Sequence, residues 1–150
     1  MTTSEAADKA KVVRTLNWLL RGEISASQTY GLAIPQVADR PQDVEVLRAI
    51  AREHDAAVES IRAAIKEAGG KPDDGATAWP GVVRSVTGPG KIFVEAAALK
   101  ALKDAEEHGL NNYRTALDQL NAEAGTLIRT AIIPARVKHI GELEALIARL

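Results

Sequence analysis

The sequence predicts an all-α protein, folded as a four-helix bundle of two antiparallel helical hairpins joined by a long crossover connection. Apolar residues make up 46% of the chain and aromatic residues only 3%, a composition typical of packed helices and not of sheets. Four long segments carry apolar residues at alternating spacings of three and four, the period of an amphipathic helix. A chain of 150 residues is most simply one domain, so we expect a single domain over residues 1–150.

The chain also contains an internal repeat. Glu followed seven residues later by Tyr occurs twice, at an offset of 83 residues, and His followed five residues later by Glu occurs twice, at an offset of 85. The repeated residues are Glu23, Tyr30, Glu106 and Tyr113 for the first pair, and His54, Glu59, His139 and Glu144 for the second. This self-similarity predicts two like hairpins packed about an approximate two-fold axis, with matching polar residues meeting in the middle.

The first predicted helix ends near Ala33, and its inward stripe has one polar member, Glu23. The stripe consists of Val12, Leu16, Leu19, Glu23, Ala26, Tyr30 and Ala33. The connection to the next helix is short and contains Pro35 and Pro41, which end one helix and begin the other. So short a loop joins only antiparallel neighbours.

The second predicted helix runs from about Pro41 to Ala68, with His54 as the polar member of its stripe. The stripe consists of Val44, Leu47, Ala51, His54, Val58, Ile61 and Ile65. The pair Gly69 and Gly70 is a strong signal for the end of the helix.

A long segment rich in Gly and Pro separates the two hairpins. Its roughly 20 residues can travel back along a helix of about 28 residues, so the third helix starts parallel to the second. Within this crossover, the spacing of Trp79, Val82, Val83 and Val86 predicts a short amphipathic helix that caps the bundle.

The third and fourth predicted helices each carry two polar residues in their inward stripes. The third stripe consists of Ile92, Glu95, Leu99, Leu102, Glu106, Gly109, Tyr113 and Ala116. A tight turn is expected near residues 121–125. The fourth stripe consists of Ile132, Arg136, His139, Leu143, Leu146 and Leu150, and Pro134 predicts a kink about one turn before His139.

Charge and composition argue against several classes of function. A net charge of −1 provides no broad basic field for nucleic acid or an anionic membrane, so neither is expected as a partner. The absence of Cys excludes disulfides and thiolate chemistry, and no phosphate-binding loop or serine triad is present. No run approaches the roughly 20 apolar residues of a membrane span, and the N-terminus lacks a signal-peptide core. We therefore expect a cytoplasmic protein.

The repeated Glu and Tyr, the crossover, and the stretches AGGKPDDG, AEEHGLNNYRTAL and IIPARVKHIGELEAL carry a resemblance that covers essentially the whole chain. The sequence resembles the ferritin-like superfamily and, within it, a bacterial family of four-helix-bundle proteins known only as a domain of unknown function. Metal-binding members of the superfamily enclose two iron or manganese ions with one Glu from each of two helices and a Glu-x-x-His from each of the others. By resemblance, Glu23 and Glu106 match the single carboxylates, and His54 and His139 match the histidines.

The chain departs from this pattern at both bridging carboxylates. Ala51 stands three residues before His54, and Arg136 three residues before His139. Two divalent ions about 3.5–4 Å apart repel each other strongly, and bridging carboxylates supply much of the charge that stabilises the pair. An intact di-metal centre is therefore not expected.

Two hypotheses remain for the polar core. In the first, which we favour, Arg136 pairs with the glutamates, one histidine is protonated, and the layer is neutral with no cofactor. In the second, Glu23, His54, Glu106 and His139 hold a single iron, manganese or zinc ion. The first corresponds to a non-catalytic protein, expected as a homodimer, and the second to a metal-handling or oxidoreductase-like protein. Whether the chain is an enzyme stays open.

The remaining polar residues are assigned structural roles. Tyr30 and Tyr113 are expected in the core, with hydroxyl groups that satisfy polar groups of the opposite hairpin. His108 lies two positions from Glu106 and is expected on the surface. The residues expected on solvated helix faces near Arg or Lys are Glu53, Glu59, Glu107 and Glu144.

Overall fold

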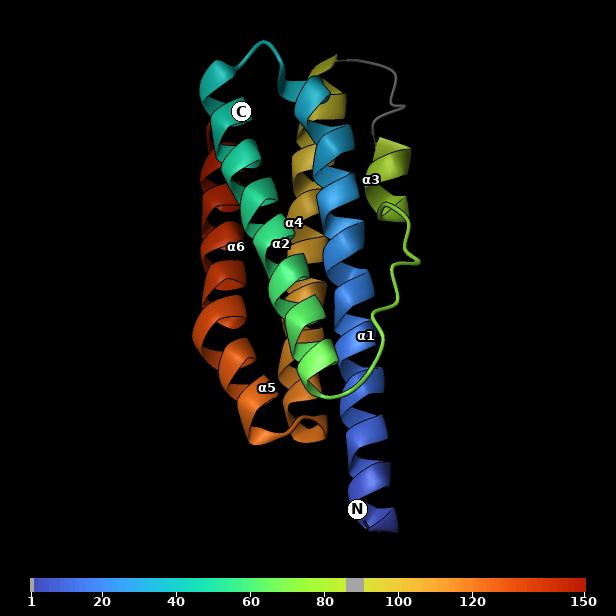
Figure 1. The fold of residues 1–150 in the computed structure, drawn as a ribbon. Coiled ribbons are helices and arrows are strands. Elements are labelled where there is room, and N and C mark those ends of the chain that lie inside the picture. Colours follow the sequence, from blue (N-terminus) through green and yellow to red (C-terminus); the bar gives the residue numbers. More distant parts are fainter. Residues whose placement is uncertain (1, 86–90) are drawn as a thin grey trace.

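A computed structural model describes residues 2–85 and 91–150 (Figure 1). The elements are α1 (Thr3–Ala33), the 3-10 helix η1 (Ile34–Val37), α2 (Pro41–Glu67), α3 (Pro80–Ser85), α4 (Lys91–Ala116), the 3-10 helix η2 (Leu117–Gln119), α5 (Ala122–Leu127), the π-helical turn η3 (Ile128–Ile132) and α6 (Ile133–Ala148). No strand occurs among these residues.

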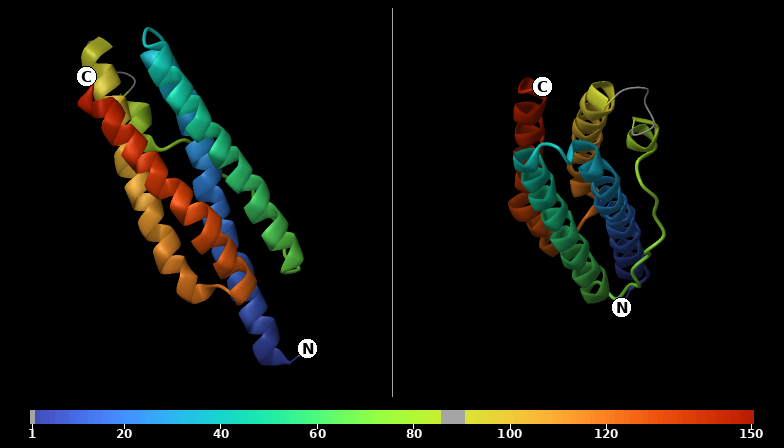
Figure 2. Two further views of the ribbon diagram at one scale, coloured as in Figure 1. Left: turned by 90° about the vertical axis from the view of Figure 1, so that its left-hand side faces the viewer. Right: turned by 90° about the horizontal axis from the view of Figure 1, so that it is seen from above.

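The long helices form two antiparallel hairpins, as predicted. Helix α2 returns alongside α1, and α6 returns alongside α4 (Figure 1). The crossover brings the chain back to the end where α2 began, so α2 and α4 run in the same direction. Viewed along the bundle, the four long helices surround a common centre, and the crossover lies outside α1 (Figure 2). The all-α bundle with a long crossover is confirmed.

Helix α1 begins well before the stripe that predicted it. Thr2 caps the helix by accepting a hydrogen bond from the Glu5 backbone, and the Glu5 carboxylate accepts one from the Thr2 backbone, both at 3.1 Å. This reciprocal capping box satisfies two backbone donors that would otherwise have no partner. The first turns of α1 therefore extend beyond the ends of the neighbouring helices (Figure 1).

The crossover is attached along the outer face of α1. The Asn17 side chain donates to the Lys71 carbonyl at 3.1 Å and accepts from the Asp73 backbone at 2.8 Å. Farther along, the Trp79 backbone donates to the Thr29 hydroxyl at 2.8 Å. These bonds hold a segment without regular structure against a helix.

The short helix α3 lies on the side of the bundle. Val82 is fully buried and packs into the core, and α3 contacts both α1 and α4. The prediction of a short helix is correct, but its expected position as a cap is wrong. Val83 is 41% exposed, and Val86 lies outside the described residues.

The fourth bundle helix starts earlier and ends sooner than its pattern predicted. The Asn121 side chain accepts a hydrogen bond from the Ala124 backbone at 2.9 Å, so α5 already begins at Ala122 and not after a turn at 121–125. At the other end, α6 stops at Ala148. Leu150 therefore lies beyond the helix and is 47% exposed, against its expected place in the core.

Pro134 affects this helix through a π-helical turn. Pro134 has no N–H to donate to the Thr130 carbonyl, and its ring crowds that carbonyl. The backbone widens just before it, and the Ile133 N–H bonds the Ile128 carbonyl five residues back. The ribbon bends between α5 and α6 at this level (Figure 1).

The core has two apolar clusters, one on each side of a polar layer. One cluster contains Val12, Leu16, Leu19, Leu20, Val58, Ile61, Ile65, Tyr113, Ala116, Ala124, Ile128 and Ile132. The other contains Tyr30, Ala33, Val37, Val44, Leu47, Ile50, Val82, Leu99, Leu102, Leu143 and Leu146.

Within the described part of the chain, no helix combines the length and the hydropathy that crossing a bilayer requires.

Candidate functional site

Five polar side chains from the four long helices meet between the two apolar clusters, and we call them the buried polar layer. They are Glu23 on α1, His54 on α2, Glu106 on α4, and Arg136 and His139 on α6. None of the five is more than 2% exposed. The structure thus brings together the four residues that the resemblance matched to metal ligands, together with Arg136.

His54 bridges the two glutamates. Its Nδ1 lies 2.5 Å from Glu23 Oε2, and its Nε2 lies 2.6 Å from Glu106 Oε1. An ionised carboxylate only accepts hydrogen bonds, so both ring nitrogens donate and the imidazole is positively charged. Burial alone would lower the pKa of His54, but the charges of Glu23 and Glu106 raise it to about 9.

Arg136 bridges the same two carboxylates from the other side. Its Nη2 donates to Glu23 Oε1 at 3.0 Å, and its Nη1 donates to Glu106 Oε2 at 3.2 Å. The guanidinium carbon also lies 5.2 Å from the centre of the Tyr113 ring, a cation–π contact. Two carboxylates therefore face two cations, and this part of the layer is neutral.

The cations determine the ionisation of both glutamates. Burial alone would raise the pKa of Glu23, but Arg136 and His54, with the hydrogen bond from Tyr113, lower it to about 2. Burial would likewise raise the pKa of Glu106, and His54, His139 and Arg136 lower it well below its ordinary value. Both groups are carboxylates at neutral pH.

Each tyrosine of the repeat bonds the glutamate of the opposite hairpin. The Tyr30 hydroxyl donates to Glu106 Oε1 at 2.7 Å, and the Tyr113 hydroxyl donates to Glu23 Oε1 at 2.5 Å. Burial, reinforced by the nearby glutamate, raises the pKa of each tyrosine well above its ordinary value. The predicted role of these hydroxyls is confirmed.

The second histidine breaks the two-fold symmetry. His139 uses Nε2 to contact Glu53 on α2, while its Nδ1 is 3.6 Å from Glu106 Oε2 and has no hydrogen-bond partner. Glu53 also accepts from Lys138 at 3.0 Å, and its side chain is 37% exposed. The prediction that Glu53 lies on a solvated face near a cation is therefore right for its contact with Lys138 but misses its contact with buried His139. The sequence offered no signal for the contact, because its partner lies on another helix.

Gly109 is a second residue whose role the sequence did not reveal. It lies three positions after Glu106 on α4, at an inward position of the predicted stripe. A Cβ atom added there would stand 2.0 Å from Nη1 and 2.6 Å from Cζ of Arg136. The missing side chain lets the guanidinium lie against the backbone of α4, at a position where glycine costs the helix roughly 0.5–1 kcal/mol.

The other polar residues lie apart from the layer. His108 is exposed, as expected, and Glu95 is buried on α4, as its stripe predicted. The other three glutamates predicted on solvated faces form ion pairs near the surface, as expected. They are Glu59 with Arg62 at 2.7 Å, Glu107 with Lys103 at 3.3 Å, and Glu144 with Lys103 at 3.7 Å.

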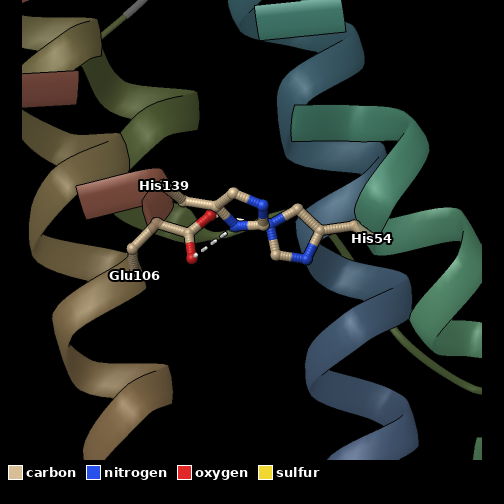
Figure 3. Close-up of side chains that lie close together, drawn as sticks. All are labelled: His54, Glu106 and His139. Carbon is tan, nitrogen blue, oxygen red and sulfur yellow. Dashed lines mark hydrogen bonds and ion pairs between the residues drawn. The ribbon is translucent and has the colours of Figure 1, made fainter. Parts of the chain in front are cut away.

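Three members of the layer present metal-ligand atoms to one another. The three atoms are one ring nitrogen of His54, one of His139 and one carboxylate oxygen of Glu106. They all lie within 4.8 Å of one another (Figure 3). Glu23 contacts the opposite nitrogen of His54, and Glu53 contacts the opposite nitrogen of His139. A carboxylate behind each ligating histidine is a common feature of protein metal sites.

A pocket of about 220 Å³ between α2 and α6 reaches this layer. Its wall includes the small side chains Ala57, Ser60, Ala131 and Ala135, and its lining includes Glu23, His54, Arg136 and His139. Ser60 and Ala131 are exposed, so the pocket opens at the surface.

The residues present do not fit a di-metal centre. Ala51 and Arg136 occupy the two positions from which bridging carboxylates would come. The guanidinium of Arg136 already bonds both single carboxylates, and it adds positive charge where two metal ions would need negative charge.

A family model and a solved structure each match most of this chain. The model of the family described as "Domain of unknown function (DUF2383)" matches residues 11–119. The chain is also similar to bacterioferritin from Rhodobacter capsulatus, with a TM-score of 0.73 and 26% identity over 93% of this chain and 84% of that chain. That bacterioferritin was solved at 2.6 Å resolution with a metal-free dinuclear site and with heme iron in a crystallographic special position. The bundle is therefore ferritin-like. No curated protein matches the chain.

Proposed function

The chain belongs to the DUF2383 family, and we propose that it is a non-catalytic ferritin-like protein whose core holds ion pairs in place of a di-metal centre. One observation carries this proposal. The buried guanidinium of Arg136 bonds Glu23 at 3.0 Å and Glu106 at 3.2 Å, so one fixed positive charge already lies between the two carboxylates without an added ion. Together with the charged His54, it leaves no excess negative charge between the two glutamates to attract a pair of divalent cations.

The metal content of the purified protein tests this proposal. We expect well under one equivalent of iron, manganese or zinc per chain, and no ferroxidase activity, because the positions of both bridging carboxylates lack an acid. Elemental analysis of protein purified without chelators, and oxygen uptake with added Fe²⁺, are the measurements. Two equivalents of metal per chain would refute the proposal.

A single bound ion is the second candidate, favoured by the unpartnered Nδ1 of His139. His54, Glu106 and His139 would hold the ion, and two imidazoles with one carboxylate suit zinc or non-heme iron. Such an ion would supply Lewis-acid chemistry to the site. One equivalent of metal that is lost in His139→Gln, and retained in the exposed control His108→Gln, would establish this candidate in place of the first.

Restoring the missing carboxylates should create metal affinity. Ala51→Glu together with Arg136→Glu adds both bridging positions and removes the competing cation, so we expect affinity for Mn²⁺ or Zn²⁺ to rise about tenfold or more. Titration calorimetry measures the effect, with Ala51→Glu alone as the control in which Arg136 still occupies the layer. Equal affinities of the double variant and the parent would contradict this expectation.

The assembly and the location in the cell also belong to this proposal. We propose a homodimer in the cytoplasm. Sedimentation equilibrium measures the first and cell fractionation the second.

A further inference from the structure

Among the glycines of the described residues, Gly109 is the one where an added Cβ atom would clash with the buried polar layer. That atom would lie 2.0 Å from Arg136 Nη1, whereas one at Gly22, Gly31 or Gly141 would meet no atom within 4 Å. Carbon and nitrogen atoms pack at about 3.5–4.0 Å, so any side chain at position 109 requires the guanidinium to move by more than about 1 Å.

The guanidinium has little freedom to make such a movement. Its side chain is 3% exposed, and both of its terminal nitrogens are bonded to buried carboxylates. The ring of Tyr113 lies against it at 5.2 Å. A shift of more than 1 Å distorts both bonds, which measure 3.0 and 3.2 Å, and breaks either one if it runs along that bond.

We propose that Gly109 determines which cation the buried polar layer holds, because it admits the guanidinium of Arg136 between Glu23 and Glu106 and so excludes a divalent metal ion. This inference rests on the proposed function and assigns a residue to its control. Gly109 acts through Arg136 and is therefore a positioning residue.

The chemistry of the layer without the guanidinium supports this assignment. Two carboxylates and two imidazoles would then face one another with no fixed cation, which is a suitable donor set for one divalent ion. The pocket between α2 and α6 provides a path for the ion, and Arg136 itself lines that pocket. The long side chain of Arg136 can extend along the pocket toward water, as arginine side chains do at protein surfaces.

Cobalt binding is the first test, with Co²⁺ as a spectroscopic probe for a zinc-like site. We expect Gly109→Ala to bind Co²⁺ at least tenfold more tightly than the parent, with visible absorption bands of a protein-bound ion. The gain should disappear in Gly109→Ala combined with His139→Gln. Gly141→Ala is the matched control, and it should bind Co²⁺ as the parent does. An unchanged affinity in Gly109→Ala would overturn the inference.

Coupling between positions 109 and 136 is the second test, measured as the urea midpoint of unfolding. Gly109→Ala should lower the midpoint in the parent but leave it unchanged or raise it when Arg136 is replaced by Met, because the clash is then absent. If Gly109→Ala does not fold alone, a folded Gly109→Ala/Arg136→Met variant still demonstrates the coupling. Equal effects in the two backgrounds would refute the role of Gly109 and leave the proposed function standing. Tight Co²⁺ binding by the parent would instead refute the proposed function itself.

Discussion

Arg136→Ala is expected to lower the free energy of unfolding by about 3–5 kcal/mol at neutral pH. The guanidinium supplies one of the two positive charges that balance Glu23 and Glu106, and neither glutamate is more than 1% exposed. Removing it leaves buried negative charge that His54 alone does not balance, and uncompensated charges in a protein interior are strongly destabilising. Urea or thermal unfolding measures the loss.

The glutamates provide the internal control for this experiment. Adding Glu23→Gln and Glu106→Gln to Arg136→Ala should recover much of the lost stability, because the charges without a partner are gone. Lys138→Ala, which removes a side chain that is 61% exposed, should stay within about 0.5 kcal/mol of the parent. A near-neutral Arg136→Ala would show that the ion pairs do not stabilise the core, and would favour the single-ion candidate.

Stability should also depend on pH on both sides of a plateau. The pKa of Glu23 falls from 4.5 to about 2 on folding, so its contribution is fully present above pH 4.5 and is lost as the pH falls toward 2. The pKa of His54 rises from 6.5 to about 9, so its contribution is fully present below pH 6.5 and is lost as the pH rises through 9. Each shift corresponds to about 3 kcal/mol at most. Maximum stability is therefore expected between about pH 4.5 and 6.5.

Unfolding free energies measured across this pH range test the assignment of charge to His54. His54→Gln should be less stable than the parent and should lose the decline above pH 6.5, because no imidazolium is left to deprotonate. His108→Gln removes an exposed histidine on α4 and should keep the decline. A parent profile that is flat from pH 6.5 to 9 would mean that His54 is neutral in the folded protein.

The buried polar layer could be predicted from sequence because each of its members interrupts an apolar stripe. Glu23, His54, Glu106, Arg136 and His139 occupy inward positions in otherwise apolar patterns, and burial follows from helical periodicity alone. The internal repeat also predicted that residues of the two hairpins would lie at the same level along the bundle axis. Helix period and an internal offset thus place a side chain in a bundle without knowledge of its partners.

The partners of the two histidines could not be predicted, because they depend on differences between the two hairpins. The repeat implied similar roles for His54 and His139, yet only α6 carries an arginine three residues earlier, where α2 has Ala51. Arg136 occupies one side of both glutamates, so His54 pairs with both of them and His139 turns toward Glu53. Such a choice rests on distances of a few ångströms between helices, and no sequence spacing encodes those distances.

The π-helical turn η3 changes the spacing of the buried residues along the fourth bundle helix. An α-helix bonds each N–H four residues back, whereas a π turn bonds five residues back, so η3 contains one residue more than an α-helix of the same rise would hold. The buried positions Ala124, Ile128, Ile132 and Arg136 accordingly follow one another at intervals of four, and the normal mixture of three and four resumes at His139. The register of α6 is therefore offset by one inserted residue from that of α5. Arg136 and His139 face the buried polar layer in this offset register, which α5 continued as a regular α-helix would not have produced.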